Sequence, residues 1–396
     1  MTVPQGSIAL FLSAILLYPA AAAAQSAEPE PAPPEEAEPA ASLKYDKGFA
    51  VESGDGEFAL KAGIRSQFRF EVLRPEAEAD EELQSRFYIP RLRLQLEGHA
   101  FGKANAYKVE FELSGRGQTI LKDFYVDRKF GSGVQVRAGQ WKKPFSRHEL
   151  VSDYSSTFNE RALANGMIDA ARDSGVMVHN GFDKSPEGIE WALGLFNAQR
   201  ADRNTSPITC EDPADPESCV AGTPTNVPGD WGPLVAARVG YNLGDVKGYA
   251  EGDLDGGPLR LAVGAGYLVD LNNLEEDDAG DVQLTHGATA DFLLKIAGFD
   301  LEGGVFLLKD GDADAEVAFL GQAGYFVLPE SVQVAGRFSL TPILGSDDET
   351  TQEILGALNF YFKGHNFKLA TDGGVITNSA DDTTDLQIRT MLQFVL

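Results

Sequence analysis

Basic side chains recur on one face of a long alternating segment near the start of the chain, where they could bind anions. Lys61, Arg65 and Arg69 occupy odd positions of residues 57–73, while the even positions from 58 to 72 are Phe, Leu, Ala, Ile, Ser, Phe, Phe and Val. Side chains alternate between the two faces of a β-strand, so the three cations would share one face. Guanidinium groups can replace the water around an anion with bidentate hydrogen bonds, and several such sites in series keep any one from trapping it.

The segment that carries these groups is longer than an ordinary strand. Soluble strands have about 5 to 6 residues, whereas a tilted strand needs about 9 to 11 to cross a bilayer. The same alternation returns at residues 88–100, 107–113, 120–127 and 134–138, where the polar face carries many formal charges. A packed dry core could not accept those charges without costly desolvation. We therefore predict an all-β protein, a closed antiparallel transmembrane barrel whose charged face lines a water-filled lumen.

Later segments alternate more weakly but complete the pattern. They are residues 174–182, 188–197, 232–242, 258–270, 282–295, 299–309, 316–327, 331–341, 352–363, 366–376 and 385–396. Together with the earlier segments they make about sixteen strands, and an even number closes such a barrel with both termini on one side. The connections mostly alternate between short and long, which predicts short periplasmic turns and long outer loops. The turn at residues 243–257 is too long for this scheme, and Pro90 removes a hydrogen bond inside a strand.

The start of the chain indicates export. Residues 8–18 are apolar and residues 20–24 are small, so we interpret residues 1–24 as a signal peptide. Residues 25–44 are rich in Pro, Ala and Glu and are predicted to be a disordered periplasmic tether. Residues 45–396 would form the barrel, which places the protein in the bacterial outer membrane. A water-soluble β-sandwich or solenoid is the rival fold, but it would need turn signals every 8 to 12 residues.

Composition narrows the possible partners and activities. The chain has 60 acidic and 33 basic residues, a formal charge of -27, which argues against nucleic acid as a partner. Its five histidines are scattered, and no nucleophile, metal or phosphate-binding motif accompanies them, so we expect no catalytic residue, metal or cofactor. Cys210 and Cys219 lie close together in a long outer connection without nearby histidine, which favours a loop disulfide.

Several motifs are similar to those of a known family. Residues 121–127 read LKDFYVD, residues 137–147 read RAGQWKKPFSR, residues 158–161 read FNER and residues 172–176 read RDSGV. They resemble the phosphate-selective porin O and P family, and looser similarity extends over the chain from about residue 45. The resemblance implies a 16-stranded outer-membrane porin, usually a homotrimer, whose third long loop folds inward to narrow the pore.

The resemblance also implies which residues meet the solute. The predicted anion path comprises Lys61, Arg65, Arg69, Arg91, Arg93, Lys108 and Arg137, and the predicted constriction loop contributes Lys142, Lys143, Arg147, Glu160 and Arg161. The expected function is passive diffusion of small hydrophilic solutes, with anions such as phosphate preferred. Inward arginines often only pair with inward acids, so a non-selective or weakly cation-preferring general porin stays open, as does a structural anchor. Outer-membrane lipid and lipopolysaccharide are expected partners.

Overall fold

The fold is described from a computed structural model. It describes residues 42–45, 48–76, 83–114, 119–168, 170–198, 208–210, 219–221, 233–276, 282–343 and 349–396. The predicted signal peptide and most of the predicted tether lie outside these residues. Among the helices in this part of the chain, none combines the length and apolar character needed to cross a membrane.

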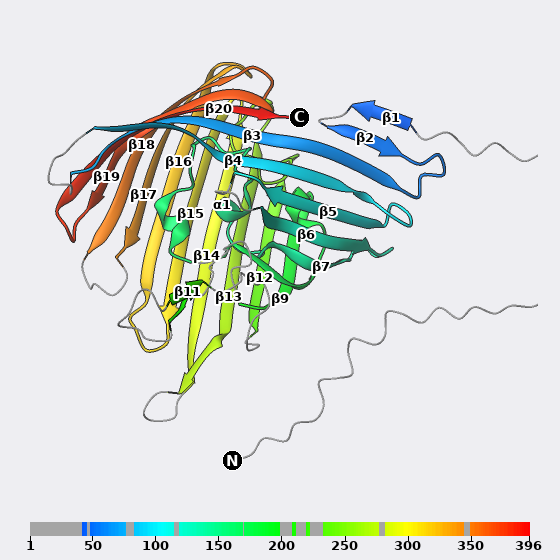
Figure 1. Ribbon diagram of the computed structural model, residues 1–396, viewed down its shortest axis with the longest axis horizontal. Helices are drawn as coiled ribbons and strands as arrows, with labels where there is room; N and C mark the ends of the chain where they lie inside the picture. The colour runs from blue at the N-terminus through cyan, green and yellow to red at the C-terminus, as the bar shows by residue number, and fades with distance from the viewer. Residues whose placement is uncertain are drawn as a thin grey trace, which may run out of the picture. The chain divides into compact units, whose positions relative to one another are not determined.

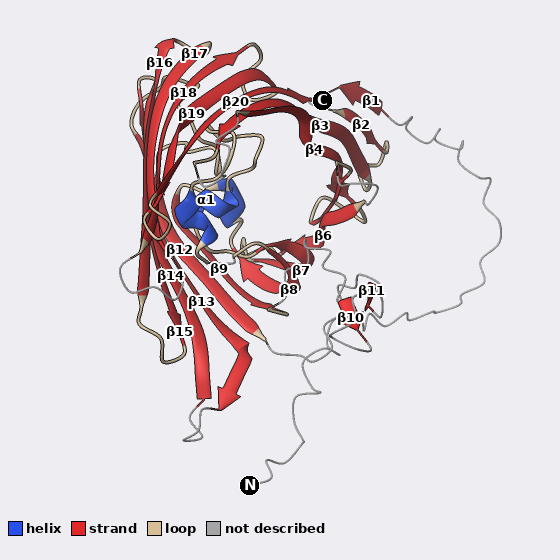
Figure 2. Cartoon of the chain, turned by 60° about the vertical axis from the view of Figure 1, so that its left-hand side comes forward, coloured by secondary structure: helices blue, strands red, loops and turns tan. Residues whose placement is uncertain are grey.

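Sixteen of the described strands close into one antiparallel barrel (Figures 1 and 2). They are β3 (Ala59–Arg74), β4 (Gln84–His99), β5 (Asn105–Glu112), β6 (Ile120–Lys129), β7 (Gln135–Lys142), β8 (Arg172–His179), β9 (Gly188–Phe196), β12 (Leu234–Leu243), β13 (Arg260–Glu276), β14 (Val282–Ile296), β15 (Phe299–Asp310), β16 (Glu316–Leu328), β17 (Val332–Pro342), β18 (Thr350–Tyr361), β19 (Phe367–Asn378) and β20 (Thr383–Val395). Each strand pairs with the next described barrel strand, and β20 returns to pair with β3, from Leu386 opposite Arg74 to Val395 opposite Arg65. The predicted fold class and strand number are confirmed.

The alternation along the strands has the predicted orientation. In β3 the outward side chains of Ile64 and Phe68 are 47% and 48% exposed, whereas the inward Arg69 is 2% exposed. The pattern is the reverse of a soluble protein, because the apolar face meets lipid and the polar face meets the lumen. At the chain end, Leu392 and Phe394 also point outward, as their register predicts.

Pro90 is accommodated by a β-bulge rather than by a break in the barrel. Gln67 pairs with Arg91 and Arg69 pairs with Tyr88, so Ile89 and Pro90 together oppose the single residue between them on β3. A bulge leaves one residue unpaired, which suits a residue without an N–H group. It also turns Tyr88 and Arg91, three positions apart, toward the same inner face.

Two short strands extend the wall beyond the closure point. β1 (Ser42–Tyr45) pairs with β2 (Phe49–Glu52), and β2 pairs with β3 from Glu52 opposite Ala59 to Phe49 opposite Ala62. They use the stretch of the β3 edge that β20 leaves free. β1 therefore covers the last residues of the predicted tether, and this pairing was not anticipated from the sequence. In the long connection between β9 and β12, β10 (Ile208–Cys210) pairs with β11 (Cys219–Ala221).

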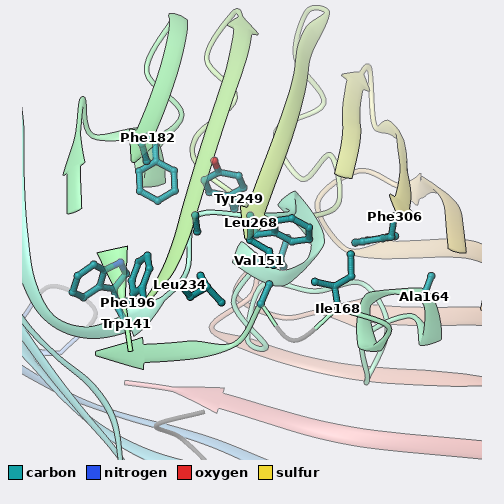
Figure 3. Close-up of a cluster of buried hydrophobic side chains, with 14 of the residues drawn as sticks. Trp141, Val151, Ala164, Ile168, Phe182, Phe196, Leu234, Tyr249, Leu268 and Phe306 are labelled. Carbon is teal, nitrogen blue, oxygen red and sulfur yellow. The ribbon is translucent and has the colours of Figure 1, made fainter. Parts of the chain in front are cut away.

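The lumen is only partly wet, which differs from the prediction of a hydrophilic bore throughout. An apolar cluster that includes Trp141, Val151, Phe196, Leu268 and Phe306 is buried inside the barrel (Figure 3). Its members come from the wall around β7 to β16 and from the connection between β7 and β8. That connection contains the short helix α1 (Arg147–Leu150) and the 3-10 turn η1 (Leu163–Gly166), and Figure 2 shows α1 within the ring of strands. The sequence pattern missed this cluster because its inward apolar residues lie on the face that alternation assigns to water.

Candidate functional site

The connection between β7 and β8 folds into the lumen over its described residues, 143–168 and 170–171, and we call it the inward loop. Polar side chains of the wall donate hydrogen bonds to its backbone carbonyl groups. Gln393 Nε2 contacts Tyr154 O at 2.8 Å, Asn359 Nδ2 contacts Thr157 O at 2.9 Å, and Arg337 Nη1 contacts Glu160 O at 2.8 Å. Irregular backbone away from water needs such partners. The loop is therefore held from β17, β18 and β20, across the barrel from the strands that it joins.

A cluster of ion pairs holds the same loop from β3 and β4. Arg69 and Arg91 both contact the Glu160 carboxylate at 2.6 Å, and Arg93 Nη2 lies 2.8 Å from Asp153 Oδ2. Arg161, within the loop, contacts Asp153 Oδ1 at 2.6 Å. Burial opposes ionisation of Asp153, but the guanidinium groups of Arg161, Arg91 and Arg93 outweigh it and hold the pKa of Asp153 well below its usual range. These arginines act as a clamp on the inward loop.

The turn that is too long for its side of the barrel supports the inward loop. Residues 244–259, between β12 and β13, also fold inward, and Tyr249, Glu251 and Asp253 are buried. Glu251 N–H donates to Ser155 O at 3.0 Å, and Glu251 Oε2 accepts from Thr157 N–H at 2.6 Å. The extra length of this turn is thus used to meet the loop inside the lumen.

Two adjoining cavities of about 300 and 500 Å³ remain along the inner face of β3 to β7. The first is lined by Arg65, Arg93, Lys108, Arg137, Lys142 and Arg172 and by Glu97, Glu110, Asp123 and Asp183. The second shares Glu97, Lys108, Tyr125, Arg137 and Asp183 with it and adds Lys61, Lys103, Lys184, Glu52 and Asp127. Nine basic and six acidic side chains therefore line the two spaces together. This wall has an excess of positive charge, although the whole chain carries -27.

The predicted path residues separate into two groups. Lys61, Arg65, Arg93, Lys108 and Arg137 line the cavities, whereas Arg69 and Arg91 face the loop and line neither of them. All seven have acidic neighbours: for example, Arg65 lies 3.5 Å from Glu110, and Lys108 lies 2.5 Å from Asp123. The side chains of Lys61 and Arg65 are the most open of the seven to solvent, at 28% and 26%.

The predicted constriction residues mostly hold the loop instead of facing the open lumen. Lys142, at the end of β7, lines the first cavity and donates to the carbonyl groups of the loop. Lys143 is buried, 3.9 Å from Asp173, and Arg147 is buried with its guanidinium over the Tyr249 ring. Glu160 and Arg161 belong to the clamp. The position of this connection as the third long loop predicted that it would fold inward. It could not predict which of its residues would face the open lumen and which would face the wall.

Other residues at the cavities were not predicted as part of the path. Arg172 contacts Asp123 at 2.6 Å, and Arg137 lies over the Tyr125 ring at 4.1 Å while it pairs with Asp183 at 2.8 Å. Arg172 belongs to the RDSGV motif and Tyr125 lies on the polar face of its strand, so the sequence could have indicated both as residues of the lumen. Asp183 lies in the turn η2 (Phe182–Lys184), which strand periodicity does not reach.

The closed sixteen-stranded barrel, its inward loop and its charged lumen are those of an outer-membrane porin. The family model "Phosphate-selective porin O and P" matches residues 58–207, the part of the chain that holds β3 to β9 and the inward loop. The resemblance noted in the sequence is confirmed over this stretch. The protein is thus a channel of the bacterial outer membrane.

Solved structures with the same fold are distant in sequence. The anion-selective porin from Comamonas acidovorans is 11% identical, with a TM-score of 0.56 over 86% of this chain and 100% of that one. The high-pH structure of OprB from Pseudomonas putida is 10% identical, with a TM-score of 0.57 over 85% and 94%. The trimer form of OmpT from Vibrio cholerae is 13% identical, with a TM-score of 0.51 over 85% and 99%. No curated protein matches the chain.

Proposed function

We propose that this porin passes small hydrophilic anions, phosphate among them, through the space between the inward loop and the β3 to β7 wall. The observation that carries the proposal is the excess of basic over acidic side chains along the two cavities in a strongly acidic chain. Local charge, rather than net charge, sets the potential that an ion meets inside a narrow low-dielectric channel. The family name and the anion-selective Comamonas porin agree with this direction.

The pairing of the cations favours passage over tight binding. Lys61 lies 3.4 Å from Glu97, Arg65 lies 3.5 Å from Glu110, and both cations keep part of their side chain open to the lumen. An anion can exchange water for these donors, while the neighbouring carboxylates limit how strongly it is held. Conduction needs this balance, because an ion must be able to leave each site that it enters.

The proposal extends to assembly and processing. Trimeric OmpT has the same fold, and we propose a homotrimer for this chain, surrounded by outer-membrane lipid with lipopolysaccharide at its outer loops. We also propose that residues 1–24 are removed as a signal peptide, that residues 25–44 tether the barrel in the periplasm, and that Cys210 and Cys219 form a disulfide. The backbone register across β10 and β11 sets these two positions opposite each other.

The test is the reversal potential of the purified full-length mature protein in planar bilayers under a potassium chloride gradient, measured with and without added phosphate. A chloride permeability above that of potassium, together with a reduced chloride current when phosphate is added, is the expected result. Equal permeabilities would instead indicate a general porin, and a potassium preference would show that the acidic groups control the path. Absence of single-channel steps in folded protein would favour a structural anchor.

A further inference from the structure

Three buried titratable groups from three different elements meet where the inward loop touches the far wall. They are His148 of α1, Glu251 of the 244–259 turn and Glu302 of β15, and each is at most 4% exposed. One nitrogen or oxygen atom of each lies within 4.8 Å of those of the other two. The site lies outside both cavities of the proposed solute path. We call these three side chains the carboxyl–histidine cluster.

The hydrogen bonds of His148 decide what this cluster can bind. The backbone N–H of Ala162 lies 3.0 Å from His148 Nε2, so this nitrogen must accept and therefore carries a lone pair. In a neutral ring the proton is then on Nδ1, which lies 3.2 Å from Glu302 Oε1 and 3.6 Å from Glu251 Oε1. A metal ion would need the Nδ1 lone pair, which would leave Nε2–H facing the Ala162 N–H. The geometry therefore favours a proton-sharing cluster over a cation site.

Among the described residues, few donors face the two carboxyl groups, so ionising both of them together would be costly. Glu251 Oε2 accepts from Thr157 N–H, and one imidazole N–H faces both Oε1 atoms. The Gln322 amide hydrogen-bonds the Glu251 carboxyl group and lies, through Nε2, 3.5 Å from Glu302 Oε2, so this one amide is shared between the two acids. Two buried like charges at this separation repel, so one carboxyl group in such a pair holds a proton that the other accepts.

The charges around the cluster do not replace that proton. Near Glu302 stand Arg147, Lys295, Arg337 and Asp291; near Glu251 stand Lys368, Asp300, Tyr361 and His365; near His148 stand Glu149, Arg161 and Arg337. Several of these are committed elsewhere: Arg337 Nε contacts Glu353 at 2.8 Å, and Lys368 Nζ contacts Ser156 O at 2.5 Å. Within the described part of the chain the Arg147 guanidinium makes no hydrogen bond; it lies over the Tyr249 ring and 4.0 Å from Asp291.

We propose that Glu251 and Glu302 share one proton near neutral pH, bridged by neutral His148, and that this shared proton fastens the inward loop to the turn and the wall. Loss of the proton in alkaline solution leaves two buried carboxylates facing each other where the inward loop, the turn and β15 meet. The loop is then released from this fastening and fluctuates into the solute path. The cluster would thus make the open state of the pore dependent on pH.

The sign of the pH dependence follows from Glu251 of the 244–259 turn and His148 of the inward loop. Burial and the neighbouring Glu302 carboxyl group raise the pKa of Glu251, so the stabilisation that its proton provides is complete in acid and is lost as the pH rises through the raised value. Burial lowers the pKa of His148 to about 4, so its neutral form persists through the neutral range. As the pH falls below about 6.5, the usual pKa of histidine, keeping His148 neutral in the fastened state costs increasing free energy, until the ring protonates near pH 4. The fastening therefore weakens on the alkaline side through Glu251 and on the acid side through His148.

The test compares brief closures of single channels in planar bilayers at pH 7 and pH 9. In the wild-type protein the closure frequency should rise between pH 7 and pH 9. The rise should be about tenfold for each unit by which the pKa of the shared proton in the fastened loop exceeds its pKa in the released loop. Glu302→Gln replaces the protonated acid by an amide that can accept from His148 and donate to Glu251, so its closure frequency should stay low at both pH values. Heat-modifiable migration on gels verifies that the variant is folded, and Glu251→Gln serves as the second variant.

A matched control loosens the same loop without a titratable group. Ser339 is buried and its Oγ accepts from Ala164 N–H at 2.9 Å, so Ser339→Ala should raise closures equally at both pH values and keep the wild-type rise at pH 9. The proposal is wrong if the wild type shows no rise, or if the folded Glu variants keep it. It is also wrong if zinc added at pH 7 suppresses closures in the wild type but not in Glu302→Gln, because the cluster would then be a cation site. Ion selectivity is read separately from the reversal potential, so either proposal can fail without the other.

Discussion

The double change of Lys61→Gln and Arg65→Gln should lower the preference of the pore for anions. Both side chains line the cavities and are more than one-quarter exposed. Their charged groups pair with Glu97 and Glu110 of the wall, and the Arg65 guanidinium also lies 5.6 Å from the centre of the Tyr154 ring of the inward loop. Glutamine keeps much of the length and the hydrogen-bonding ability of each side chain but removes its charge. The substitution therefore tests the charge on the path and leaves the arginine clamp of Arg69, Arg91 and Arg93 in place.

The expected size follows from Coulomb's law. An ion 4 Å from a unit charge in a water-like medium gains or loses about 1 kcal/mol, and the effect on an anion is opposite to that on a cation. Removing one cation should thus change the free-energy difference between an anion and a cation at that point of the path by about 2 kcal/mol. We take about half of this, since the carboxylates of Glu97 and Glu110 lie 3.4 and 3.5 Å from the two cations and oppose them. About 1 kcal/mol for each cation corresponds to a roughly fivefold fall in the chloride-to-potassium permeability ratio per substitution, and about 2 kcal/mol to a roughly thirtyfold fall for the double variant.

The reversal potential in a potassium chloride gradient measures this ratio, and the fall should shrink at high salt because the charges are screened. Arg128→Gln is the matched control. Arg128 is exposed near the end of β6, lines neither cavity and contacts Asn105, so its removal should leave the ratio unchanged. An unchanged ratio in the double variant, or an equal fall in the control, would refute the assignment of the path.

Three further changes test the loop, the barrel wall and the outer connection. Asp153→Asn leaves buried guanidinium groups without their carboxylate, so thermal unfolding should show a loss on the order of 3 kcal/mol and single-channel noise should increase; wild-type noise would contradict the clamp. Gly374→Ala places a Cβ atom 2.0 Å from a backbone oxygen of the neighbouring strand and should lower the free energy of unfolding by about 1 to 3 kcal/mol. In Gly356→Ala the added Cβ atom meets no described atom within 4 Å, so this control should be tolerated. Equal unfolding temperatures of the two variants would argue against the strand register. Maleimide should label Cys210 and Cys219 only after reduction, and labelling of the oxidised protein would exclude the disulfide.

The position of Arg65 and Arg69 shows where sequence reasoning stops. Both lie on the inward face of β3, and alternation predicted that face for each. The structure leaves Arg65 partly open beside Glu110, while Arg69 is buried against Glu160 of the inward loop. The two residues are four positions apart on one strand, but the Arg69 guanidinium pairs with an acid of the inward loop and the Arg65 guanidinium pairs with an acid of the wall. No local pattern contains the position of a segment that is more than seventy residues away.

The sequence by itself determined the barrel. Strand periodicity has a period of two, so each run of alternating residues specifies which side chains meet lipid and which point inward, and the lengths of the runs specify a bilayer. Strand number and closure followed from counting these runs. Even the anomaly at Pro90 was visible in the sequence, although the bulge that accommodates it was not.

Only the tertiary structure decided how the interior is divided. The inward loop, the 244–259 turn and the apolar cluster fill one side of the lumen and leave the charged cavities along β3 to β7. Which inward arginine pairs with which acid depends on contacts between residues far apart in the chain, such as Arg337 with the carbonyl group of Glu160. Irregular segments lack a repeating pattern, and their course is set by the partners that satisfy their backbone groups, which exist only once the barrel has closed.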